Sequence, residues 1–177
     1  ALALFRGWPR FASLLGAAFA GWLRPGEYLG ATRFNIQFPQ DVCDAERTWT
    51  LWRHFQPKTR RSGARQQPSR IDDESVQLLL WEVFGGLQPP DRLWPWAPSR
   101  FRDRYRQLAT AFGTTSIPLG GARGGGATDY YAATEDAPRT LRRGRWSTYQ
   151  VMDRYLQEAE TTNRLDLLSD NEKLKVQ

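Results

Sequence analysis

An apolar segment near the start of the chain limits its possible folds more than any other feature. Residues 11–23 contain no charged side chain. A helix that crosses a bilayer needs about 20 apolar residues, and this run is shorter. We therefore expect residues 11–20 to form a buried core helix of a globular domain, and not a targeting peptide. Gly21 and Pro25 end this helix, and a short helical turn is expected from Pro25 onward.

The remaining patterns predict a mainly helical α+β domain with one small antiparallel sheet. Residues 48–55 alternate between two faces, which is typical of a half-buried strand. A turn at 61–64 and a returning strand at 65–71 complete a hairpin with Lys58 near its tip. Residues 120–126 read as a glycine-rich loop. A further strand is expected at 33–38 and helices at 74–84, 100–112, 127–134, 137–143 and 147–160.

The charge of the chain favours a nucleic-acid partner. The net charge is +6, and among the 25 basic residues only Lys58, Lys173 and Lys175 are lysines. Arginine presents a flat fork of donors that matches two phosphate oxygens at once. An arginine-rich basic domain is therefore typical of nucleic-acid binding, although a GC-rich genome that favours arginine codons would produce the same composition.

Cysteine and histidine are too few for the common metal sites. Cys43 is the single cysteine and His54 the single histidine. An internal disulfide is impossible, which fits a reducing, intracellular compartment. Structural and catalytic zinc sites draw several ligands from these two residue types. We therefore expect no metal and no cofactor.

Several segments have both a structural and a functional interpretation, and the structural one is stronger for each taken singly. Arg24 and Glu27 have the spacing of a helix-surface ion pair. Lys58 is either an exposed turn residue or a general acid, a role closed to arginine because arginine does not release its proton. Arg123 sits in a glycine-rich segment that either connects two elements or cradles phosphate. Tyr155 has the spacing of a core aromatic residue.

The order of these segments resembles the catalytic domain of tyrosine recombinases, the phage integrase-like enzymes. Residues 22–27, Trp-Leu-Arg-Pro-Gly-Glu, resemble the motif that ends an apolar helix in this family, with Trp22 where glycine is usual. Lys58 resembles the lysine of the family's hairpin. Residues 120–128 resemble the His-x-x-Arg segment and the small residues that follow it. In this family the nucleophilic tyrosine follows nine residues after a histidine or tryptophan, and Trp146 and Tyr155 resemble this pair. The sequence Gly-Arg-Trp at 144–146 resembles most the form found in recombinases of eukaryotic mobile elements such as Cryptons.

This resemblance implies an α+β integrase-like catalytic domain over residues 1–163 whose upstream part is missing, followed by a polar tail at 164–177. It implies that the tyrosine attacks a DNA phosphodiester without a metal and forms a 3′-phosphotyrosyl intermediate. Two arginines and the tryptophan would stabilise the phosphorane, and the lysine would protonate the leaving 5′-oxygen. The implied catalytic residues are Arg24, Lys58, Arg123, Trp146 and Tyr155.

The expected partner is double-stranded DNA, bound by a homotetramer on paired sites, with no membrane and no small-molecule cofactor. The resemblance to eukaryotic mobile-element recombinases implies a location inside the cell, in the nucleus. Further arginines are expected to contact the DNA backbone in a salt-dependent way. These DNA-binding candidates are Arg60, Arg61, Arg65, Arg100, Arg102, Arg104, Arg106, Arg142, Arg143 and Arg145.

The resemblance departs from the family pattern at Gly120, which occupies the position of the histidine in His-x-x-Arg. Two alternatives therefore stay open beside an active recombinase. The first is a DNA-binding remnant of a recombinase that has lost activity. The second is an arginine-rich module that binds RNA or a protein partner, for which the five candidate side chains would be scattered in space.

Overall fold

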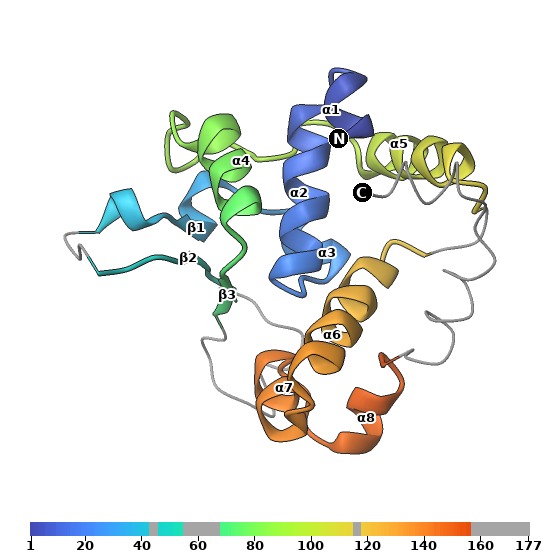
Figure 1. Ribbon diagram of the computed structural model, residues 1–177. Coiled ribbons are helices and arrows are strands. Elements are labelled where there is room, and N and C mark those ends of the chain that lie inside the picture. Colours follow the sequence, from blue (N-terminus) through green and yellow to red (C-terminus); the bar gives the residue numbers. More distant parts are fainter. Residues whose placement is uncertain (43–45, 55–67, 115–117, 157–177) are drawn as a thin grey trace.

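A computed structural model describes residues 1–42, 46–54, 68–114 and 118–156 (Figure 1). The described residues form an α+β fold that is mainly helical, as the sequence predicts. The helices are α1 (Leu2–Phe5), α2 (Pro9–Ala20), α3 (Pro25–Leu29), α4 (Glu74–Phe84), α5 (Pro98–Ala111), α6 (Gly121–Thr134), α7 (Ala137–Arg143) and α8 (Tyr149–Asp153), with short 3-10 turns at Arg33–Asn35 and Pro39–Asp41. The strands are β1 (Ile36–Gln37), β2 (Thr50–Trp52) and β3 (Ser69–Ile71).

The strands pair antiparallel in the order β1-β2-β3. Thr50 lies opposite Ile71, and Trp52 lies opposite both Ile36 and Ser69. Thr50, Trp52 and His54 are all buried, so one complete face of the predicted alternation points inward. The strand predicted at 33–38 is shorter than expected, because its first half forms a 3-10 turn.

The apolar helix α2 lies at the centre of the molecule, with α4 and the sheet on one side and α6 at its lower end (Figure 1). Its residues Phe11, Leu14 and Ala17 are fully buried, as expected for a core helix. A second, smaller apolar cluster joins α6 to α8 and contains Trp22, Ala127, Trp146 and Met152. Two of the functional candidates belong to this second region: Trp146 is a member of the cluster, and Tyr155 packs against it.

The prediction of a glycine-rich loop at 120–126 is wrong, because α6 begins at Gly121. Glycine weakens an isolated helix by about 1 kcal/mol relative to alanine. Here, however, the absence of side chains lets α6 approach α2 closely. A methyl group on Gly126 would overlap the backbone of Phe19, and one on Gly125 would lie 3.3 Å from the Phe19 ring. Tertiary packing therefore overrides the local preference.

Helix ends agree with the sequence where capping residues are present. Asp73 accepts a hydrogen bond from the backbone N–H of Val76 at 2.8 Å and begins α4. Asp136 and Thr148 cap α7 and α8 in the same way. The helix predicted at 147–160 is shorter than expected, since α8 ends at Asp153. The part of that prediction beyond residue 156 and the tail at 164–177 lie outside the described residues.

Candidate active site

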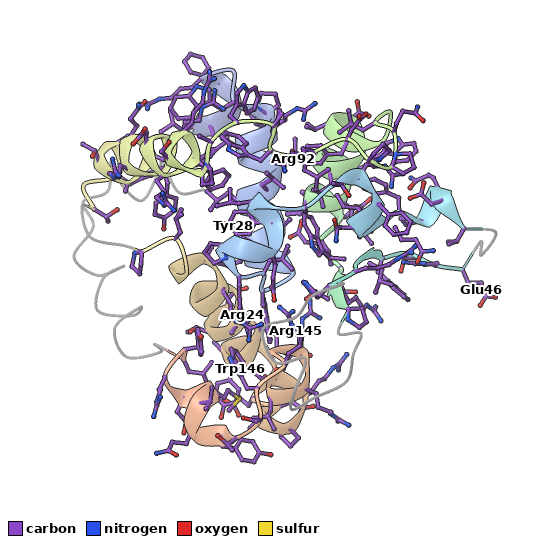
Figure 2. The ribbon with its side chains drawn as sticks, turned by 180° about the vertical axis from the view of Figure 1, so that it is seen from behind. Arg24, Tyr28, Glu46, Arg92, Arg145 and Trp146 are labelled. Carbon is purple, nitrogen blue, oxygen red and sulfur yellow. The ribbon has the colours of Figure 1, made fainter. Side chains whose placement is uncertain are left out.

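The carboxylate of Glu27 is the centre of a partly buried charge cluster at the start of α3. Arg24 donates to it twice, from its backbone N–H at 2.8 Å and from Nη1 at 2.9 Å. Arg145 reaches it from the segment after α7 with a bidentate pair at 3.0 and 2.9 Å. A single acidic side chain therefore holds two guanidinium groups that are far apart in the sequence. Figure 2 shows the labelled Arg24 and Arg145 close together.

Arg145 differs most from its sequence-based interpretation. It is predicted as a surface contact to the DNA backbone, but its side chain is only 6% exposed. Besides Glu27 it donates to the backbone oxygen of Trp22 at 3.1 Å. Its backbone adopts a left-handed conformation with φ 57°, which a sequence pattern does not reveal.

Arg123 projects from the first turns of α6 into the same cluster and is 1% exposed. Its Nη1 donates to the Trp22 oxygen at 3.2 Å, and its Nη2 donates to the oxygen of Gly144. The Trp22 oxygen thus receives both Arg123 and Arg145. Trp22 itself has φ 52°, a left-handed conformation that costs a non-glycine residue roughly 1–2 kcal/mol. This is the position at which the recombinase motif usually has glycine.

Trp146 and Tyr155 cover the guanidinium group of Arg123. The two rings stack on each other with centroids 5.1 Å apart and planes 30° apart. The central carbon of the guanidinium lies 5.2 Å from the centroid of the Trp146 ring and 5.4 Å from that of the Tyr155 ring. Such distances permit cation–π attraction. Tyr155, the predicted nucleophile, follows α8 and lies against Arg123, the second arginine of the predicted catalytic set.

His54 is a member of the cluster that sequence reasoning missed as a functional residue. Its Nε2 lies 3.0 Å from the Ser69 hydroxyl, and its Nδ1 lies 3.8 Å from Glu27 Oε2. The order Ser69, His54, Glu27 is that of a hydrolase triad. Burial and the charge of Arg145, however, lower the pKa of His54 to about 4, and Ser69 is only 3% exposed. A weak base beside an inaccessible hydroxyl does not suit that chemistry.

The cluster carries two positive charges in excess, since it contains the guanidinium groups of Arg24, Arg123 and Arg145 and the single carboxylate of Glu27. Burial raises the pKa of Glu27, but the hydrogen bond and charge of Arg145 outweigh burial and hold it at about 2. Burial and the charges of Arg24 and Arg145 lower the pKa of Arg123 to about 10. Cations in a partly desolvated site are stabilised by a bound anion.

Several buried donors of this region have no hydrogen-bond partner among the described residues. They are the Nε atoms of Arg123 and Arg145 and the indole Nε1 of Trp146. A buried N–H without an acceptor costs about 1–3 kcal/mol. Each of the three is an N–H donor, so together with the excess charge they favour an oxyanion as the ligand of this site.

Four of the five catalytic candidates come together: Arg24, Arg123, Trp146 and Tyr155. Lys58 and the DNA-binding candidates Arg60, Arg61 and Arg65 lie outside the described residues. Gly120, at the position of the absent histidine, is the N-cap of α6, and a side chain there would meet no atom within 4 Å.

The other DNA-binding candidates lie away from Glu27. Arg143 pairs with Asp72 at 2.7 Å, and its guanidinium carbon lies 4.9 Å from the Tyr130 ring centroid. Arg142 is exposed on α7. Arg100 and Arg104 lie on α5, toward the opposite end of α2 from the cluster (Figure 1). The role of these arginines in DNA binding stays a prediction.

The described residues contain no group of three His, Cys, Asp or Glu side chains that would hold a metal ion. No helix among them is long and apolar enough to span a bilayer. The sequence matches no protein-family model and no curated protein. The functional interpretation therefore depends on the geometry of the site itself.

Proposed function

We propose that this chain cleaves and rejoins duplex DNA through a covalent tyrosyl intermediate, with Tyr155 as the nucleophile. The observation that carries the proposal is the placement of Tyr155 and Trp146 against the buried guanidinium of Arg123. The nine-residue step from Trp146 to Tyr155 supports it independently, as does the left-handed Trp22 at the usual glycine position.

In the proposed reaction a DNA phosphodiester occupies the oxyanion site of the cluster. The phenolic oxygen of Tyr155 loses its proton to water and forms a bond to phosphorus, while the bond from phosphorus to the 5′-oxygen breaks. That oxygen takes a proton from Lys58. Arg24, Arg123 and the indole N–H of Trp146 stabilise the negative charge of the phosphorane, and the reverse reaction rejoins the strand. A preorganised donor of this kind contributes about 3–4 kcal/mol to the transition state.

Glu27 and Arg145 hold the site in place and do not carry out the chemistry. The bidentate pair fixes the Glu27 carboxylate, and the carboxylate fixes Arg24. An arginine held in this way loses little side-chain entropy when it binds a phosphate. We propose that duplex DNA is bound by a homotetramer, as in the recombinases that the chain resembles.

The second candidate function is DNA binding without cleavage. It is favoured by the burial of Arg123, whose two Nη groups donate to backbone oxygens rather than facing solvent. The absence of a histidine at Gly120 favours it too. For this function the basic surface would bind the backbone, and the phosphate would not reach Tyr155.

A nicked suicide duplex separates the two functions, since cleavage next to the nick traps the protein on the DNA. The first function predicts a covalent adduct with the wild-type chain and none with Tyr155→Phe, although both bind the duplex. Gly120→His, which the open space around Gly120 accommodates, should increase the adduct rate by ~10² or more. Equal behaviour of wild type and Tyr155→Phe would leave binding without cleavage as the function.

A further inference from the structure

The single histidine of the chain joins the sheet to the arginine cluster. His54 follows β2, and Ser69, the first residue of β3, lies 3.0 Å from its Nε2. The other ring nitrogen faces Glu27, whose carboxylate holds Arg24 and Arg145. The proposed cleavage reaction gives this imidazole no role. Its side chain is nevertheless buried in the site, with only 2% of its surface exposed.

The two contacts select one tautomer of the ring. If Nε2 carried the proton, the lone pair of Nδ1 would point at the negatively charged Glu27, which is unfavourable. If Nδ1 carries the proton, it faces the carboxylate and Nε2 accepts from the Ser69 hydroxyl. At 3.8 Å the contact with Glu27 is longer than a hydrogen bond and is therefore electrostatic. The imidazole thus presents a positive N–H edge to Oε2, which already accepts from the backbone N–H of Arg24 and from Nη2 of Arg145.

Protonation of His54 is governed by the groups that surround it. Burial opposes a positive charge on the ring, and so do the charges of Arg145, Arg24 and Arg123, whereas Glu27 favours it. The arginines outnumber the carboxylate, so the ring is neutral near neutral pH. The balance would change if a second negative charge entered the cluster.

We propose that His54 is a positioning residue of this site, which orients Glu27 in the free protein and gains a proton when a DNA phosphate binds to the arginines. The phosphate adds the anion that the three guanidinium groups lack. A unit charge about 6 Å away changes a proton affinity by roughly 100-fold at an effective dielectric constant of about 20. A protonated imidazole would then hold Glu27 by a full ion pair while the guanidinium groups turn to the phosphate.

This inference rests on the proposed phosphate site but not on cleavage, and Tyr155→Phe keeps the two separate. The experiment measures binding of this variant to an intact duplex by fluorescence anisotropy at constant ionic strength. Histidine is the side chain whose ordinary pKa lies between about pH 5.5 and about pH 7.5, and His54 is the only one. Binding should tighten at least about threefold as the pH falls through this window, because one proton is taken up with the DNA.

Adding His54→Asn to this variant is the matched control. The asparagine amide can replace the Nδ1–H donor toward Glu27 but cannot titrate in this window. Binding should then be independent of pH. A slope that persists with asparagine, or an affinity of Tyr155→Phe alone that does not change with pH, would overturn the proposal.

A second measurement needs no variant at this position. The chain has one histidine, so its imidazole gives one Hε1 resonance, and a pH titration by NMR follows His54 alone. The titration midpoint should rise when the duplex is added and stay unchanged when an equal ionic strength of sodium chloride is added. An unchanged midpoint with bound duplex would reject the coupling. An absent covalent adduct with an intact pH slope would reject cleavage and leave this inference standing.

Discussion

Arginines at the two ends of α2 have opposite environments. On α5, Arg104 lies against three tryptophan rings, with its guanidinium carbon 5.2 Å from the Trp8 centroid, 5.4 Å from that of Trp94 and 5.6 Å from that of Trp96. Arg100, which is exposed, also lies against Trp96. At the other end, the side chains of Arg123 and Arg145 are buried in the Glu27 cluster.

The difference teaches that arginine content does not locate a site, because the same side chain has two energetic roles. An arginine stacked on a surface ring keeps most of its hydration, and the contact contributes about 0.5–1 kcal/mol. A buried guanidinium has lost its hydration and depends on protein acceptors and on a nearby opposite charge. The surface of α5 can therefore lose a charge at small cost, and the Glu27 cluster cannot.

The largest effect is expected for Glu27→Gln, which removes the acceptor shared by Arg24 and Arg145. The substitution leaves buried guanidinium groups without a counter-ion, and we expect the free energy of unfolding to fall by about 3–5 kcal/mol. Urea unfolding followed by tryptophan fluorescence measures it. The matched control is Asp103→Asn, which breaks the exposed pair with Arg106 on α5 and should cost less than about 1 kcal/mol. A similarly small loss for Glu27→Gln would show that the two regions do not differ.

Acid should destabilise the cluster through His54. The folded-state pKa of this residue is about 4, below its ordinary value of 6.5. As the pH falls through this interval, the unfolded chain takes up a proton that the folded protein does not, so stability present above pH 6.5 is lost progressively toward pH 4. The loss is on the order of 3 kcal/mol.

Thermal unfolding at several pH values measures this loss. His54→Asn should remove the loss of stability that occurs at pH values above the range in which carboxyl groups ordinarily titrate. The low pKa of Glu27 contributes a separate loss, between 4.5 and about 2. The surface of α5 has no histidine, so this prediction concerns the buried region alone. A flat wild-type profile between pH 6.5 and pH 5 would contradict it.

The smallest effects on stability are expected for Arg100→Ala and Arg104→Ala. Each should change the free energy of unfolding by about 1 kcal/mol or less. If α5 contacts the DNA backbone, each should lower the slope of log affinity against log salt concentration by about 1. Anisotropy titrations between low and moderate salt measure the slope. An unchanged slope in both variants would remove α5 from the DNA-binding surface.

The sequence predicts those parts of the fold that depend on local signals. The buried helix α2, the capped helix α4 and the paired strands β2 and β3 follow from apolar periodicity, capping carboxylates and alternation. Helix α6 is predicted only over residues 127–134, because the glycines that begin it are explained by the approach of α2 and not by any local preference.

The candidate site is predicted in the same partial way. The order of the motifs along the chain predicts Arg24, Arg123, Trp146 and Tyr155. For Arg145 the sequence predicts only a contact to the DNA backbone, since its pairing with Glu27 depends on a contact between residues 118 positions apart. His54 carried one usable signal, the alternation that buries it with Thr50 and Trp52. A lone buried histidine is not enough to indicate a site without its neighbours in space.

The glycines of α6 have a consequence beyond packing. Helix α2 leads directly into Arg24, and α6 carries Arg123, so the separation of the two backbones sets how far apart the two cations stand. That spacing depends on the absence of a side chain at Gly126. Any larger residue there would push the two helices apart and increase the distance between the two charges. In this protein the packing distance between α2 and α6 and the separation of the two arginines in the anion site cannot be varied independently.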